Sequence, residues 1–140
     1  MQIPDDGMQP GPGPVLTGNE TVLVVDDCEE VRNFLNFALS QFGYNVICAV
    51  DGMDGLEKYT ENKDKIHVML IDVFLPKLTG IELFKEINKL GSNSKALFMS
   101  GYTEAFNMKN QQDEIKCIKF ISKPFRIKTL LKEMREVLAD

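Results

Sequence analysis

The sequence predicts an α/β fold in which five parallel strands alternate with five helical segments. Three features predict it: short apolar runs without period-two alternation, apolar residues at helical spacing between those runs, and the regular alternation of the two patterns. Because strand–helix–strand connections are right-handed in nearly all proteins, such a chain forms one doubly wound parallel sheet with helices on both faces.

The start of the chain has little capacity to build a core. The first 20 residues contain four prolines and four glycines but few large apolar side chains. Burial there cannot offset the entropy lost on ordering the chain. We therefore expect residues 1–19 to be a flexible N-terminal tail or linker and residues 20–140 to form the domain.

Two strand–helix pairs are predicted in the first half of the domain. Thr21–Val25 is a short apolar run, and the helical pattern of Glu29–Phe42 follows it and stops at Gly43. Acidic residues in the first turn of that helix suit the positive end of its dipole. A second strand is expected over Tyr44–Val50, with a weaker, glycine-containing helix over Asp51–Asn62.

The central strand carries the first candidate for chemistry. Four consecutive apolar residues, Val68–Ile71, lead directly into Asp72, and Pro76 and Gly80 then break the pattern. Periodicity alone would also allow a buried helical segment, but the short length and the flanking breakers favour a strand. Ligands of open parallel sheets bind outside the carboxyl ends of the strands, which places Asp72 for chemistry. The alternative is that Asp72 only caps a turn.

The second half of the domain continues the alternation. A helix over Ile81–Leu90 precedes a strand over Lys95–Met99. The polar stretch Glu104–Glu114 predicts only a short, loosely held helix. A fifth strand over Cys117–Ile121 is followed by a strongly amphipathic last helix over Ile127–Leu138.

Composition excludes several classes of function. A chain of 140 residues with 44% hydrophobic content suffices for one ordinary core. Sixteen basic against 21 acidic residues give a net charge of −5, which argues against direct binding of nucleic acid. No apolar run approaches the roughly 20 residues that cross a bilayer, so we expect a cytoplasmic domain without membrane contact. The three cysteines lack the spacing of a disulfide framework or zinc site.

Polar residues follow the ends of four of the predicted strands, and the fold would gather them at one edge of the sheet. They are Asp26, Asp27, Asp72, Ser100 and Lys123. Three crowded carboxylates repel one another, and a hard divalent cation such as Mg²⁺ relieves that repulsion. With a lysine and a hydroxyl alongside, the cluster suits phosphoryl transfer, in which a carboxylate oxygen attacks phosphorus to form an acyl phosphate.

Four motifs in these positions resemble the receiver domain of two-component response regulators, which are CheY-like proteins. The resemblance covers Glu20 to about Leu138. The motifs are Val24–Asp27, Leu70–Pro76 with Gly80 beyond it, Met99–Tyr102 and Ser122–Phe125. Any one of them alone is weak, but four in the order and spacing of the family are very specific.

The resemblance implies a flavodoxin-like (βα)5 fold with strand order 2-1-3-4-5. It also implies that Asp72 accepts a phosphoryl group from a histidine kinase or a histidine phosphotransfer domain, and that the domain is a switch and not an enzyme. The resemblance is also compatible with a receiver–receiver dimer. The implied residues are Asp27, Asp72 and the backbone carbonyl of Phe74 for Mg²⁺, Asp26 through water, Lys123 as phosphate sensor, and Ser100 and Phe120 as switch residues.

Some positions distinguish this chain within the family pattern. Cys28 stands where the family usually has an acidic or amide residue. Phe74 and Tyr102 bracket the expected path of the hydrolytic water with bulky side chains and offer no carboxylate or amide to orient it, which predicts a phosphorylated lifetime of minutes or longer. The resemblance implies a cis Lys123–Pro124 bond, and the need for the lysine to point back into the carboxylate cluster favours the same geometry.

Two other functions share parts of this pattern. A dehalogenase-like phosphatase or phosphotransferase also places an aspartate after a parallel strand, but it needs a second acid at the position of Phe74. A docking module that is never phosphorylated would not need the acidic, hydroxyl and lysine residues. The run Gly18–Asp27 after a Pro/Gly linker, together with Ser100–Thr103, resembles receivers attached to hybrid sensor histidine kinases.

Overall fold

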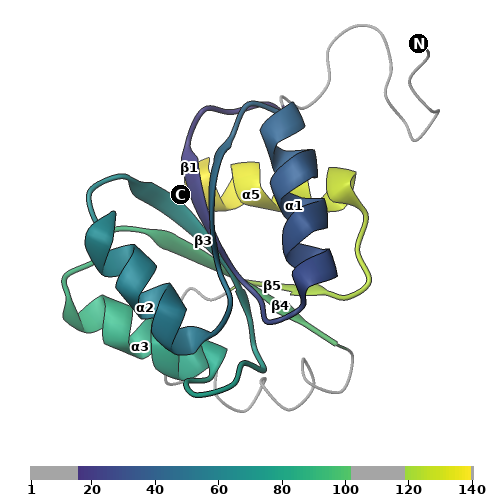
Figure 1. Ribbon diagram of the computed structural model, residues 1–140. Helices are drawn as coiled ribbons and strands as arrows, with labels where there is room; N and C mark the ends of the chain where they lie inside the picture. The colour runs from purple at the N-terminus through teal and green to yellow at the C-terminus, as the bar shows by residue number, and fades with distance from the viewer. Residues whose placement is uncertain (1–15, 102–118, 140) are drawn as a thin grey trace, which may run out of the picture.

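The computed structural model describes residues 16–101 and 119–139. Its strands form one five-stranded sheet in the order β2-β1-β3-β4-β5, with every neighbouring pair parallel, as the sequence and its family resemblance predict (Figure 1). The strands are β1 (Thr21–Val25), β2 (Asn45–Ala49), β3 (Ile66–Asp72), β4 (Lys95–Ser100) and β5 (Lys119–Ser122).

Among the residues that the structure describes, four helices cover the two faces of the sheet. They are α1 (Glu29–Gln41), α2 (Gly52–Glu61), α3 (Gly80–Lys89) and α5 (Ile127–Ala139). Helices α1 and α5 pack on one face, and α2 and α3 pack side by side on the other (Figure 1). The helix predicted over Glu104–Glu114 lies outside the described residues. Within the described part of the chain, no helix is both long and apolar enough to cross a membrane.

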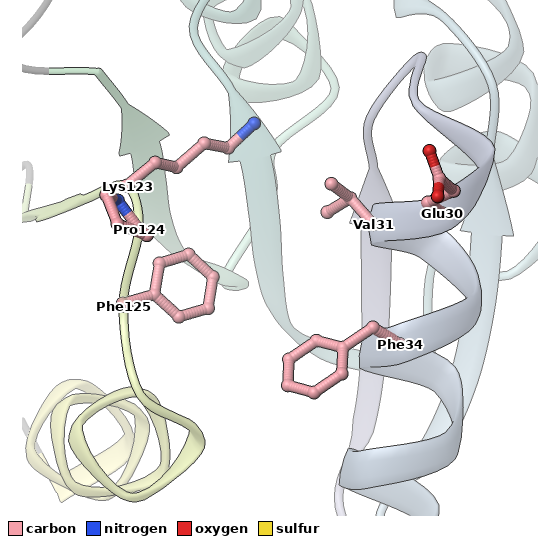
Figure 2. A pocket seen from close by; sticks show the side chains of 6 residues that line it. All are labelled: Glu30, Val31, Phe34, Lys123, Pro124 and Phe125. Carbon is pink, nitrogen blue, oxygen red and sulfur yellow. The ribbon is translucent and has the colours of Figure 1, made fainter.

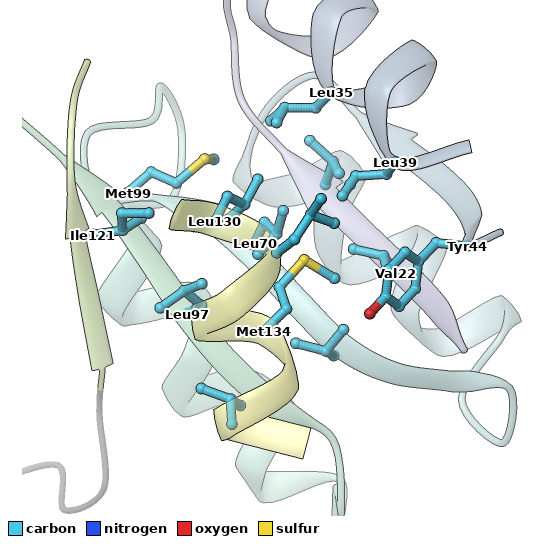
Figure 3. Close-up of a cluster of buried hydrophobic side chains, with 14 of the residues drawn as sticks. Val22, Leu35, Leu39, Tyr44, Leu70, Leu97, Met99, Ile121, Leu130 and Met134 are labelled. Atoms are coloured by element: carbon cyan, nitrogen blue, oxygen red, sulfur yellow. The ribbon is translucent and has the colours of Figure 1, made fainter. Parts of the chain in front are cut away.

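The central strands are buried on both faces, which explains their unbroken apolar runs. Along β1, Val22 and Val24 face the core under α1 and α5, whereas Leu23 and Val25 face the core under α2 and α3. All four side chains have no exposed surface. Figure 3 shows the first core, where side chains of β1, β3, β4 and β5 meet those of α1 and α5. Burial of each such side chain contributes about 1.5–3 kcal/mol.

The start of α3 fixes the loop that follows β3. Thr79 caps the helix by accepting from the Glu82 N–H, and the Glu82 carboxylate accepts from the Thr79 N–H. At Gly80, the N–H donates to the Val73 carbonyl, and a side chain would collide with the Asp72 carbonyl. This close approach of two backbone segments holds the end of β3 in place.

The packed domain begins before the boundary set at Glu20. Leu16 is buried in the core under α1 and α5, with 7% of its surface exposed. The Gly18 N–H donates to the Phe42 carbonyl at 3.0 Å, and Asn45 donates from its side chain to the Asn19 carbonyl at 3.1 Å. The expectation that residues 16–19 belong to a tail is therefore wrong, because tertiary contacts order them.

Residues 16–20, which lead into β1, are called the entry segment below. Two glycines with positive φ allow a matched test of how this segment packs. Gly43 has φ 98° and approaches the Gly18 carbonyl, whereas Gly91 has φ 77° and no described atom within 4 Å of the point where a Cβ would lie. Gly91→Ala should lower the free energy of unfolding by about 1–2 kcal/mol, the cost of a left-handed alanine. Gly43→Ala should cost roughly 1–3 kcal/mol more because of the collision. Equal losses in urea unfolding would show that Gly18 moves away freely.

The contact between the entry segment and α5 should depend on pH. Arg135 donates to the Glu20 carboxylate at 2.8 Å, and this hydrogen bond lowers the pKa of Glu20 from 4.5 despite partial burial. A carboxyl group whose pKa is lowered in the folded state stabilises the fold when the pH is above the pKa of the unfolded chain. That contribution disappears as the pH falls through the pKa of the folded state. Glu20→Gln should therefore cost about 0.5–1 kcal/mol near pH 7. The difference from the wild type in denaturant unfolding should shrink steadily as the pH is lowered below 4.5; a constant difference would contradict this.

Candidate functional site

The carboxyl edge of the sheet brings together the five polar residues predicted to form the site. Asp26 and Asp27 follow β1, Asp72 ends β3, Ser100 ends β4 and Lys123 follows β5. One oxygen from each of the three aspartates lies within 4.8 Å of the others. The parallel topology alone produces this cluster, because every strand points its carboxyl end to the same edge.

A single ammonium group joins two of the acids. Lys123 Nζ lies 3.0 Å from Asp26 Oδ2 and 3.2 Å from Asp72 Oδ2. Burial alone would lower the pKa of Lys123, but the hydrogen bond to Asp26 and the charges of both acids outweigh it and raise that pKa. The Lys123–Pro124 bond is cis, as predicted. Lys123 is thus held as a cation between the two carboxylates.

Asp72 stands apart from ordinary carboxyl groups. Burial and the neighbouring charge of Asp26 raise the pKa of Asp72 to about 6, and the Lys123 ammonium only partly opposes this shift. Its Oδ1 also accepts from the Phe74 N–H at 3.2 Å. The carboxylate therefore lies in a site with too little positive charge, which a bound cation would correct.

The other two aspartates differ in their freedom to bind a metal. Asp26 is fully buried, and its oxygens already accept from the Cys28 N–H at 2.9 Å and from Lys123. Asp27 is exposed, and neither of its carboxylate oxygens accepts a hydrogen bond from a described residue. Oxygen donors of this kind fit Mg²⁺. Asp27 and Asp72 are the acids best placed to bind the ion directly, and Asp26 is better suited to a supporting role.

Ser100 adds an unused hydroxyl. Its Oγ is the one buried side-chain nitrogen or oxygen without a hydrogen-bond partner among the described residues. An unpaired buried hydroxyl costs folding free energy, so its presence at the edge of an acid cluster calls for a ligand. A group that brings hydrogen-bond acceptors into the cluster would satisfy it.

Phe120 belongs to a row of aromatic rings that runs away from the site. Its ring lies 5.7 Å from that of Phe98, which in turn lies 5.7 Å from that of Phe84 in edge-to-face geometry. The row therefore connects β5 through β4 to α3. Of the two residues predicted to bracket the water path, Phe74 is 58% exposed and Tyr102 lies outside the described residues.

A groove beside the acids was not predicted. It has a volume of about 500 Å³ and runs between the first turns of α1 and the loop after β5, with Phe34 and Phe125 on opposite walls (Figure 2). Phe34 is 49% exposed and Phe37 is 68% exposed. Helical spacing alone would group Phe34 with the buried residues of α1, but the structure leaves about half of its side chain exposed. The signal was an excess of large apolar residues on α1 over what one face can bury.

Arg32 was also missed by sequence reasoning. Its Nη1 donates to the main-chain carbonyl of Asp26 at 2.8 Å. This carbonyl belongs to the peptide group that joins the two neighbouring aspartates. A basic residue in the first turns of a helix is unfavourable for the helix dipole, and that was the available signal that Arg32 has another task.

Comparison with known proteins agrees with this geometry. The chain is 34% identical over 123 residues to the sensor kinase CckA of Brucella abortus (strain 2308), which covers 88% of this chain and 13% of that protein. It is 28% identical over 120 residues to sporulation initiation phosphotransferase F of Bacillus subtilis (strain 168), covering 86% of this chain and 94% of that protein. The chain thus resembles a small part of one relative and nearly all of the other.

A solved structure and a family model give the same result. The response regulator receiver domain protein from Clostridium thermocellum superposes with a TM-score of 0.78 at 25% identity, over 86% of this chain and 94% of that one. The model of the response regulator receiver domain matches residues 22–135. That match includes the acid pair, Asp72, Ser100 and Lys123, and the chain therefore belongs to the response regulator receiver domain family.

Proposed function

We propose that this chain is the phosphoacceptor of a two-component phosphorelay and that Asp72 receives the phosphoryl group. The observation that carries this proposal is the arrangement of Asp72, with its raised pKa, beside the Lys123 ammonium and the unpartnered hydroxyl of Ser100. An Asp72 carboxylate oxygen attacks phosphorus while the bond from phosphorus to the donor nitrogen breaks. The nitrogen keeps the electron pair, and the product is an acyl phosphate.

Mg²⁺ would be held by Asp27, Asp72 and the backbone carbonyl of Phe74, with Asp26 acting through water. When bound, the ion offsets negative charge that gathers on the phosphoryl oxygens. Lys123 offers a second positive charge and already lies 3.2 Å from Asp72. The domain would in this way promote its own phosphorylation and dephosphorylation, without acting on a separate substrate.

Phosphorylation would change the partners of the switch residues. Phosphoryl oxygens compete with Asp26 for the Lys123 ammonium and give the buried Ser100 hydroxyl an acceptor. Movement of the β4 end would reach Phe120, whose ring packs on Phe98 of that strand. Such a change shifts the balance between two conformations and does not require a new fold.

The phosphodonor would be a histidine kinase or a histidine phosphotransfer domain. The groove between α1 and the loop after β5 supports this, because it exposes apolar surface directly beside Lys123 (Figure 2). The match to part of a sensor kinase supports a place in a hybrid kinase. A cytoplasmic location and a receiver–receiver dimer stay predictions.

Acetyl phosphate can test the phosphoacceptor directly. With Mg²⁺ present, the wild type should gain one phosphoryl mass that hydroxylamine removes, and Asp72→Asn should gain none because it lacks the nucleophile. Asp27→Ala should lose both Mg²⁺ binding and phosphorylation. Intact-mass spectrometry reads the result, and Asp64→Asn, an exposed aspartate on the opposite edge, is the matched control. A labile phosphoryl mass on the Asp72→Asn variant would refute the assignment.

The lifetime of the acyl phosphate should depend on Phe74. This side chain is 58% exposed beside Asp72 and has no group that could orient a water for attack. Phe74→Asn supplies an amide and removes bulk, so the phosphorylated form should decay several times faster. Phe37→Asn, at an exposed phenylalanine on α1, controls for the substitution itself. An unchanged or longer lifetime in the Phe74 variant would contradict steric shielding.

A further inference from the structure

The two acids that follow β1 are joined by a peptide group that an arginine holds. Arg32 reaches back from α1 and donates from Nη1 to the Asp26 carbonyl at 2.8 Å. Rotation of this peptide group would turn the Asp27 backbone and carry the exposed carboxylate with it. The hydrogen bond therefore restricts the direction in which Asp27 presents its oxygens.

Main-chain hydrogen bonds flank this turn, from the Asp26 N–H to the Ala49 carbonyl at 3.2 Å and from the Arg32 N–H to the Cys28 carbonyl at 3.0 Å, but few side chains fix it. Cys28 is the N-cap residue of α1, and its side chain makes no capping hydrogen bond, although Ser, Thr, Asp or Asn commonly make one at this position. The Asp26 side chain accepts from the Cys28 N–H, but the same carboxylate is also needed by Lys123. Among the described contacts of the turn, only that of Arg32 comes from a side chain that is not itself in the acid cluster.

Arg32 also brings positive charge close to the acidic edge. The pKa of Asp54 in α2 is lowered mainly by its hydrogen bond with Lys58, and the Arg32 charge adds to that shift. Arg32 is partly buried, and its guanidinium lies 2.8 Å from the Asp26 carbonyl, so its charge is less screened by solvent than that of an exposed arginine.

We propose that Arg32 is a positioning residue for the Mg²⁺ site, which acts by orienting the peptide group between Asp26 and Asp27. It does not touch the ion. The inference rests on the metal site of the proposed function and adds a residue to it. Because the Cys28 side chain makes no capping hydrogen bond, the orientation of this turn depends more strongly on the hydrogen bond from Arg32.

Calorimetric titration of the unphosphorylated protein with Mg²⁺ tests this without any phosphodonor. Arg32→Gln should weaken Mg²⁺ binding by about tenfold, the lower end of the effect of outer residues around a metal. Arg135→Gln is the matched control, because Arg135 also donates to an oxygen, that of Glu20, but at the opposite edge of the sheet. It should lower thermal stability and leave the Kd for Mg²⁺ within about twofold of the wild type.

A double-mutant cycle tests the link to Cys28. Cys28→Ser supplies a capping hydroxyl, so Arg32→Gln should weaken Mg²⁺ binding less in that background than in the wild type. An equal tenfold loss in both backgrounds would overturn the explanation through Cys28.

The remaining outcomes separate this inference from the proposed function. If Arg32→Gln and Arg135→Gln change the Kd equally, Arg32 is only a structural residue and the inference fails. If the wild type binds no Mg²⁺ at millimolar concentration, the metal site fails, and the inference fails with it. Phosphorylation of Asp72 by acetyl phosphate is measured separately and would still report on the phosphoacceptor.

Discussion

Three carboxylates and one ammonium lie at the carboxyl end of the sheet, and the chemistry of the site depends on this imbalance of charge. Lys123 pairs with Asp26 and Asp72, which leaves a net negative cluster whose repulsion, together with burial, raises the pKa of Asp72. A carboxyl group whose pKa is raised in the folded state destabilises the fold when the pH is above that folded-state pKa. It has no such effect when the pH is below the pKa of the unfolded chain. The domain therefore keeps an unfavourable site at neutral pH, and a cation or a phosphoryl group with its cation changes that site most.

The core supplies the stability that such a site needs. Strands β1, β3 and β4 are buried between two helical layers, so the residues at their ends cannot spread apart to relieve repulsion. The contact of Gly80 with the Asp72 carbonyl and the capping box at Thr79 hold the loop after β3 in the same way. A rigid scaffold under a strained electrostatic site is what allows a small chemical change to alter the surface.

The sequence could predict features that follow from the strand topology, and it could not predict features that depend on tertiary contacts. Parallel topology alone places strand ends together, so Asp26, Asp72 and Lys123 were predictable from apolar runs and the residues after them. The contacts of Leu16 were not, because a short segment is ordered by the surface that receives it. The exposure of Phe34 was missed for a similar reason: helical periodicity reports which side is apolar, and not whether a neighbouring element covers it.

Lys123 belongs both to the acid cluster and to the groove, so binding at one of these places is coupled to binding at the other. Its ammonium bonds to Asp26 and Asp72, whereas its stem lines the groove together with Pro124 and Phe125 (Figure 2). A ligand in the cluster that draws the ammonium to a new partner also changes the wall of the groove. Coupling of this kind is reciprocal, so a protein bound in the groove alters the affinity of the cluster for that ligand by the same factor. On the proposed function, recognition of the donor and the chemistry at Asp72 would be linked through this one side chain.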